Sequence, residues 1–329
     1  MHQAHCSSLK CVLKLALVCC VLGCAPYVSA QSVNAKDSHH PVTVSKITYH
    51  GWPDSFLLSN GVVEAVVVPA VGRVMQFRFA GEEGVFWENP ALAGKTADPS
   101  AKEWANFGGD KSWPQPQPDW QKMIGRGWPP PATFDSTPLT AALKGEAVEL
   151  ESPVDPAYGI RVRRHIELDP KQPVLKITTT YEKMTGGPVK TGIGVITQLR
   201  DPDRAIMLLP EKPLFPKGYV LLNFDPPAGV RLEKGLLSVE RSHTARSQIG
   251  SDAGTLEWFG EKYVLRIDSP RVDGAEYPNQ GSSTVIYTNS DPDAYVELET
   301  FSPLSTMKVG DKIERTNTYT FSHRHGQVP

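Results

Sequence analysis

The chain has 329 residues, and its 34 Lys and Arg nearly balance its 36 Asp and Glu, giving a formal net charge of −2. These charges form no basic block, so the chain lacks the dense positive charge on which non-specific binding to nucleic acid or anionic lipid rests. Its 27 Gly and 29 Pro are typical of strands joined by turns.

Residues 1–30 have the pattern of a signal peptide. Lys10 and Lys14 precede an apolar run, Leu15–Cys24, and Val28–Ala30 offers small residues at the two positions that signal peptidase needs. The run is shorter than the roughly 20 apolar residues that a membrane-spanning helix requires. We therefore expect export to the periplasm or the medium, with no membrane span.

A lipid anchor is the alternative. Val21–Cys24 resembles a lipobox, which would leave Cys24 lipidated in an outer-membrane lipoprotein, but Leu22 fits its position poorly and simple cleavage is favoured. After simple cleavage the mature chain has no cysteine, and after lipidation it keeps only the modified Cys24. In either case we expect no disulfide, no thiolate nucleophile and no cysteine metal site. The five cysteines all lie in the leader: Cys6, Cys11, Cys19, Cys20 and Cys24.

Most of the remaining chain reads as short strands. Val, Ile, Thr and Tyr recur in alternation with polar residues, and Gly, Pro, Asn and Asp separate the runs. Strands without long helices must bury their apolar faces against another sheet, so we expect an all-β sandwich. The expected strands are Val42–His50, Val62–Pro69, Arg73–Phe79, Arg161–Leu168, Val174–Glu182, Val189–Gln198, Tyr263–Asp268, Ser283–Thr288, Ala294–Phe301 and Ile313–Phe321.

The expected organisation is a flexible arm at 31–41, one domain at 42–323 and a flexible tail at 324–329. A long interruption, Asn89–Pro138, carries four tryptophans and is rich in Pro, Gly and Gln. Disordered segments are poor in aromatic residues, so this stretch is expected to be ordered and functional. Lys102–Phe107 and Pro118–Ile124 could each form a short helical turn.

Several stretches resemble the galactose-mutarotase-like (aldose 1-epimerase-like) superfamily. Residues 59–81 read SNGVVEAVVVPAVGRVMQFRFAG, similar to its opening pair of strands, and residues 294–321 read AYVELETFSPLSTMKVGDKIERTNTYTF, similar to its ending. WANFGGDKSWPQPQPDW at 104–120 and YPNQGSSTVIYTN at 277–289 resemble a bacterial family of unknown function inside that superfamily. The resemblance implies a β-supersandwich of large antiparallel sheets that holds a sugar or oligosaccharide.

The same resemblance suggests a partial catalytic set. Mutarotases use a glutamate as general base and histidines as acid, and the glutamate corresponds to Glu299. Gln198 stands where a histidine is expected, and glutamine cannot transfer a proton at neutral pH. We therefore expect sugar binding with weak or absent mutarotation of free aldoses. Glu297, two residues before Glu299, is expected on a solvated outer face, with Val296 and Leu298 in the core.

The tryptophan-rich segment supplies further binding candidates. Asn106, Asp110, Lys111 and Trp113 combine polar groups for sugar hydroxyls with an aromatic face for the C–H surface of a sugar. Arg73 could reach the same pocket from a strand end or pair with a surface carboxylate. The alternative for Asp110 and Lys111 is a surface ion pair, with the tryptophans capping the edge of a sheet.

No metal or cofactor is expected, because the histidines lack ligand spacings such as His-x-x-x-His and there is no Gly-x-Ser-x-Gly elbow. Two functions follow. The first is an exported carbohydrate-binding protein that could process its ligand with Glu299 as general base. The second is a non-catalytic module of the cell envelope that recognises a glycan or a partner protein. An acidic cavity lined by tryptophan would favour the first, and an exposed convex tryptophan patch the second.

We expect the exported protein to begin at Gln31, because the small residues of Val28–Ala30 set the cleavage point. Intact-mass spectrometry of protein exported by a bacterial host checks this. A mass that begins at Cys24 and includes a diacylglyceryl group would contradict it and establish the lipoprotein.

Overall fold

The computed structural model describes residues 41–98, 102–224, 227 and 229–326. The predicted signal peptide, its cysteines and nearly all of the predicted arm lie outside the described residues. Arg324, which the sequence assigns to the flexible tail, donates its backbone N–H to the carbonyl of Lys262 at 2.8 Å.

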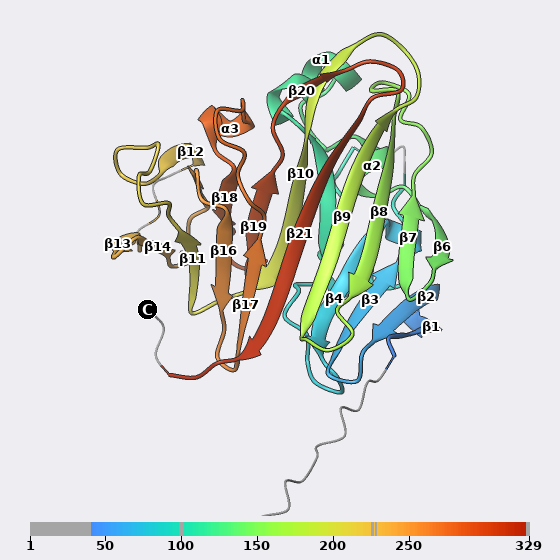
Figure 1. Ribbon diagram of the computed structural model, residues 1–329, viewed down its shortest axis with the longest axis horizontal. Coiled ribbons are helices and arrows are strands. Elements are labelled where there is room, and N and C mark those ends of the chain that lie inside the picture. Colours follow the sequence, from blue (N-terminus) through green and yellow to red (C-terminus); the bar gives the residue numbers. More distant parts are fainter. Residues whose placement is uncertain (1–40, 99–101, 225–226, 228, 327–329) are drawn as a thin grey trace, which may run out of the picture. The chain divides into compact units, whose positions relative to one another are not determined.

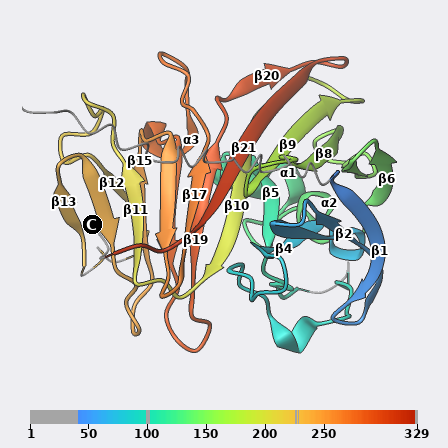
Figure 2. The ribbon, with the colours of Figure 1, turned by 60° about the horizontal axis from the view of Figure 1, so that its bottom comes forward.

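Two large sheets, in which neighbouring strands are antiparallel, build the fold (Figure 1). The eleven-stranded sheet has the order β1 (Thr43–Tyr49), β2 (Trp52–Ser59), β3 (Val63–Val68), β4 (Arg73–Phe79), β5 (Asp110–Gln115), β10 (Val189–Arg200), β19 (Tyr295–Phe301), β18 (Thr284–Thr288), β15 (Ser247–Ser251) and β12 (Val220–Phe224), with β20 (Ser305–Met307) paired to β10. The ten-stranded sheet has the order β13 (Arg231–Glu233), β14 (Leu236–Val239), β11 (Arg204–Leu208), β16 (Thr255–Phe259), β17 (Tyr263–Asp268), β21 (Lys312–His323), β9 (Val174–Lys183), β8 (Ile160–Leu168), β7 (Ala147–Glu151) and β6 (Thr140–Lys144). Figure 2 shows the long strands β10 and β21 crossing the middle of the molecule.

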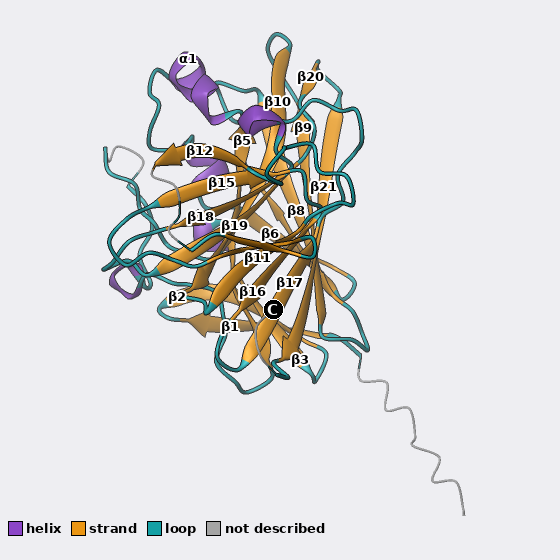
Figure 3. Cartoon of the chain, turned by 90° about the vertical axis from the view of Figure 1, so that its left-hand side faces the viewer, coloured by secondary structure: helices purple, strands orange, loops and turns teal. Residues whose placement is uncertain are grey.

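The ten predicted strands are all present, so the predicted all-β sandwich is confirmed. Among the described residues, helices are limited to short turns beside the strands (Figure 3). They are η1 (Pro69–Val71), η2 (Pro90–Leu92), η3 (Gln117–Asp119), α1 (Trp120–Ile124), α2 (Ala132–Asp135) and α3 (Pro278–Gly281). The predicted turn at Pro118–Ile124 is confirmed as η3 and α1, whereas the helical turn predicted at Lys102–Phe107 is wrong, since those residues form bends and irregular chain.

The core between the two sheets is apolar. Phe77 from the first sheet and Ile166 and Phe321 from the second belong to one buried cluster, together with Val296 and Leu298 as the sequence predicts. Burying each such side chain contributes about 1.5–3 kcal/mol, so this layer is the main source of stability.

One charged pair interrupts the apolar layer. In β8 the side chains alternate, and Arg164 shares the buried face with Val162 and Ile166. Its guanidinium pairs with the carboxylate of Asp110 on β5, and it also donates to the Asp110 carbonyl at 2.9 Å. Tyr319 on β21 donates to the same carboxylate at 2.5 Å. Because a buried carboxylate is costly unless it is paired and hydrogen-bonded, this cluster fixes β5 against the second sheet.

Candidate functional site

Three adjacent strands bring the candidate residues together. Lys111 on β5 and Glu299 on β19 both pair with Ile196 on β10, so the three side chains share one face of the sheet. This is the outer face, because the alternate residue Asp110 points between the sheets. The next position along β10, Gln198, pairs with Glu297 on the same face.

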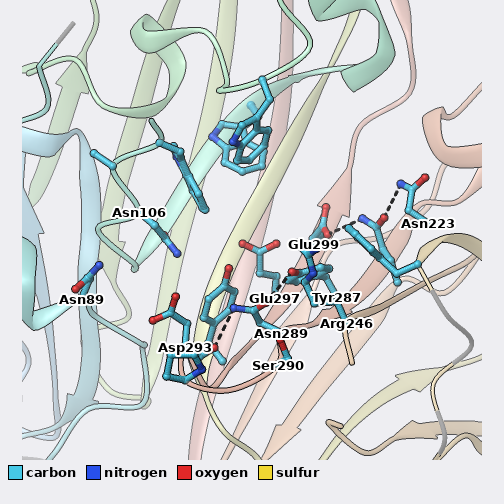
Figure 4. Close-up of a pocket in the computed structure, with 18 of the residues that line it drawn as sticks. Asn89, Asn106, Asn223, Arg246, Tyr287, Asn289, Ser290, Asp293, Glu297 and Glu299 are labelled. Atoms are coloured by element: carbon cyan, nitrogen blue, oxygen red, sulfur yellow. Dashed lines mark hydrogen bonds between the residues drawn. The ribbon is translucent and has the colours of Figure 1, made fainter. Parts of the chain in front are cut away.

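A cavity of about 1050 Å³ lies over this face, slightly larger than the range of about 300–1000 Å³ that is usual for small-molecule sites. One wall comes from the tryptophan-rich segment and the other from β12, β15, β18, β19 and the loop before β19 (Figure 4). The lining residues are Asn89, Leu92, Glu103, Trp104, Ala105, Asn106, Trp113, Gln117, Trp128, Asn223, Phe224, Arg246, Gln248, Tyr287, residues 289–293, Tyr295, Glu297 and Glu299.

The tryptophan wall is held by one buried carboxylate, that of Asp135 in α2. It accepts hydrogen bonds from the indoles of Trp104 at 3.0 Å and Trp113 at 2.8 Å. Arg73 Nη2 donates to it at 2.9 Å. Trp128, which is 46% exposed, packs edge-on against Trp104 and Trp113 with ring centroids 5.1 and 5.8 Å apart. The wall is therefore rigid at its base, and its outermost ring remains accessible.

Glu297 and Glu299 lie side by side at the floor of the cavity (Figure 4). The prediction of a solvated outer face for Glu297 is wrong: the residue is only 7% exposed, because the tryptophan-rich segment covers this part of the sheet. Burial raises the pKa of both carboxyls, and the neighbouring Glu297 helps to raise the pKa of Glu299 to about 8.

Lys111 decides how the two carboxyls share their charge. Its Nζ lies 3.6 Å from Glu297 Oε1, which favours the ionised form of Glu297 over that of Glu299, and Glu299 keeps its proton at neutral pH. The ammonium is buried beneath the rings of Trp113 and Trp104, 5.0 and 5.6 Å from their centroids. Burial lowers the pKa of Lys111 to about 8, against the attraction of Glu297.

The structure places the other predicted residues as follows. Asn106 and Trp113 line the cavity with Glu299. The placement of Asp110 in the cavity is wrong, because strand alternation turns it into the sandwich, away from Lys111. Arg73 does not line the cavity either, since it is fully buried behind the tryptophan wall. The alternative, a surface ion pair between Asp110 and Lys111, is also wrong. Both residues are buried, and their side chains point to opposite faces of β5.

Gln198 is fully buried on the cavity side of β10. Neither its Oε1 nor its Nε2 meets hydrogen-bond geometry with a partner among the described residues. The amide nevertheless lies close enough to the Glu297 carboxyl to lower the pKa of that group, so it is directed at the cavity floor. None of the described residues that line the cavity is a histidine.

The second wall was not identified from sequence. Gln248 donates to Glu299 at 3.4 Å and accepts from Asn223 at 2.9 Å, while Tyr287 donates to Asn289 at 3.0 Å (Figure 4). Tyr287 and Asn289 lie inside the stretch 277–289 that carries the family resemblance, so that signal could have found them. Asn223 and Gln248 lie on β12 and β15, short strands whose alternation is weak.

Comparison with solved structures identifies the architecture. A galactose mutarotase-like protein from Lactobacillus casei ATCC 334 aligns with a TM-score of 0.54 over 82% of this chain and 100% of its own, at 9% sequence identity. The chain has the galactose-mutarotase-like fold. A galactose mutarotase related enzyme from Lactobacillus acidophilus aligns over 82% of this chain and 97% of its own, with a TM-score of 0.51 and 9% identity. A TPR-domain containing protein from Parabacteroides distasonis ATCC 8503 gives a TM-score of 0.57 and 13% identity, over 84% of this chain and 49% of its own.

No family model matches the sequence, and no curated protein matches it. At such low identities the likeness concerns the mutarotase-like fold, and a fold does not by itself carry an activity. Within the described part of the chain, no helix is long and apolar enough to cross a membrane. No group of three or more His, Cys, Asp or Glu is placed there to hold a metal ion.

The raised pKa of Glu299 makes stability depend on pH. The folded protein holds this proton more tightly than the unfolded chain does. The stability that Glu299 contributes is therefore fully present below its ordinary pKa of 4.5 and is lost as pH rises through about 8. We expect the free energy of unfolding to fall across that window by up to about 1.4 kcal/mol per pH unit. Glu299→Gln should flatten the decline in denaturant titrations, whereas Glu314→Gln, on the exposed face of β21, should not. Parallel declines in wild type and Glu299→Gln would contradict the raised pKa of Glu299.

Proposed function

We propose that this protein is exported and binds a carbohydrate in the cavity between the tryptophan wall and strands β12, β15, β18 and β19. The observation that carries the proposal is the pairing of indole faces with amide, hydroxyl and carboxyl groups around one cavity. Sugars present both C–H faces that pack on aromatic rings and hydroxyls that need hydrogen-bond partners. The mutarotase-like fold supports a carbohydrate-binding or carbohydrate-processing role at the level of architecture.

The position of the tryptophans favours this function over an envelope module that recognises a partner protein. Trp104 and Trp113 face the cavity, and only Trp128 is substantially exposed. A docking surface for a protein partner would place such rings on a convex face, where they could enter the partner. Export rests on the N-terminal sequence, with secretion or a periplasmic location as the proposed destination and a lipidated Cys24 as the alternative.

Carbohydrate processing is the second candidate, with Glu299 as its proton-transferring group. Glu299 has a pKa near the working range of a general acid or base, and it lies beside Glu297, which pairs with Lys111. A mutarotase also needs a second proton-transferring group, and Gln198 cannot act as one. Weak or absent mutarotation of free galactose or glucose therefore stays our prediction.

Trp128→Ala tests the binding proposal without disturbing the base of the wall, since Trp128 is the exposed ring. We expect the variant to bind sugar about tenfold more weakly, because it loses an aromatic face worth roughly 1–2 kcal/mol. Calorimetric titrations with glucose, galactose, N-acetylglucosamine and their short oligosaccharides measure the effect.

Leu143→Ala provides the control, because Leu143 is an exposed apolar side chain on β6 of the other sheet. It should bind as wild type does. Equal affinities in wild type and Trp128→Ala would remove the tryptophan wall from the binding site. Failure of wild type to bind any sugar of the panel would contradict the proposed function.

A further inference from the structure

The buried charges around the cavity floor are balanced except at one position. Asp110 pairs with Arg164, and Asp135 pairs with Arg73 at 2.9 Å. Glu297 faces Lys111 at 3.6 Å. Three carboxylates therefore face three cations. Glu299 is the fourth carboxyl, and no described cation lies within ion-pair distance of it.

Hydrogen bonding leaves Glu299 equally unsatisfied. Its one hydrogen bond with a described residue comes from Gln248 at 3.4 Å, which is long for an amide donor. A buried carboxylate is normally stabilised by several donors or by a cation. The cavity side of Glu299 is therefore the direction from which a strong donor can approach.

The groups that face Glu299 do not supply a cation. Glu297 adjoins it on β19, and Lys111 on β5 is engaged by Glu297. From β18, Tyr287 contributes a neutral phenol whose pKa burial raises to about 12. Before β15, Arg246 stacks on Phe224, with its guanidinium carbon 4.8 Å from the ring centroid.

The walls of the cavity strengthen its negative potential. Glu103, Asp291 and Asp293 line it, and Arg246 is the one lysine or arginine among the described lining residues. Arg241 neutralises Asp291 at 2.9 Å, so the negative excess of the walls comes from Glu103 and Asp293 against Arg246. A low-dielectric cleft lined by acids attracts cations and disfavours anions.

We propose that the carbohydrate ligand is an amino sugar whose ammonium group pairs with Glu299 on the cavity floor, an inference that rests on the proposed sugar-binding function. The ammonium provides three donors to a carboxyl that has one long hydrogen bond. It also supplies the positive charge that completes the fourth pair. Uronic acids are excluded by the same potential.

Pairing with a cation changes the protonation of Glu299. In the free protein its carboxyl keeps a proton at neutral pH, because burial raises its pKa to about 8. An ammonium beside it stabilises the carboxylate, so the carboxyl proton leaves to the buffer while the amine keeps its own. Binding of an amino sugar therefore releases about one proton, whereas binding of a neutral sugar releases none.

Calorimetric titrations with glucosamine and galactosamine test this against their N-acetyl forms, which have the same ring but no charge. Near pH 6.5 Glu299 must lose its proton before it can pair with the ammonium, so we expect the free amino sugars to bind about threefold more tightly, a preference that grows as the pH rises toward the pKa of about 8. Repeating each titration in two buffers of different ionisation enthalpy measures the proton released by wild-type protein.

Glu299→Gln keeps the shape of the side chain and should abolish both the preference for the amine and the proton release. Glu314→Gln removes a carboxylate from the opposite sheet and should retain both. Circular dichroism confirms that each variant is folded, and the proton count in wild type needs no variant.

The outcomes separate the two proposals. If N-acetylglucosamine binds as tightly as glucosamine and no proton is released, the amino-sugar inference is wrong while the sugar-binding function stands. If no sugar binds, the proposed function is wrong and the inference fails with it. Tighter binding of Nα-acetyl-lysine amide than of either amino sugar would assign the ammonium to a peptide ligand and also overturn the inference.

Discussion

The pairing of β5 with β10 and of β10 with β19 is the constraint on which the site depends. In this register Lys111 and Glu299 share one face, and Asp110 takes the other. A slip of one residue in β5 would exchange the faces, moving Lys111 into the sandwich and Asp110 into the cavity. The contact of Asp110 with Arg164 and Tyr319 opposes such a slip, because it ties the inner face of β5 to the second sheet.

The buried ion pairs have a structural and an electrostatic consequence. Paired buried charges contribute little net stability, but removal of one partner leaves a charge that costs several kcal/mol. This makes the arrangement around β5 specific to one register. It also makes the lone Glu299 costly in its ionised form, which is why its proton is retained. Buried titratable groups without a structural partner are characteristic of sites that bind a ligand or transfer protons.

Local sequence patterns predict the strands well where one face is apolar. The alternation in β8 even places Arg164 on its apolar face beside Val162 and Ile166. An arginine on an apolar face requires a buried acidic partner. This position therefore indicated that an acid such as Asp110 lies between the sheets. β5 itself was not predicted, because both of its faces are buried and it contains a proline, so it shows neither alternation nor a typical strand composition.

The environment of the cavity could be predicted only in part. Alternation correctly places Glu297 and Glu299 on one side of β19, but their burial depends on a segment nearly two hundred residues away in sequence. The same holds for Arg73. Its position after a glycine turn does not indicate that it is buried and paired with Asp135. The family resemblance supplied Glu299 and the sandwich, whereas the charge pairs and the donor-poor surroundings of Glu299 follow from tertiary contacts.

The protonation state of Glu299 is the point on which the electrostatic account rests most directly. A carbon-13 NMR titration of side-chain carboxyls, with the Glu299 resonance assigned by its loss in Glu299→Gln, measures that state without a ligand. The account predicts a carboxyl that is protonated at neutral pH and titrates near the value of about 8. A Glu299 resonance that titrates near the ordinary glutamate pKa of 4.5 would contradict it.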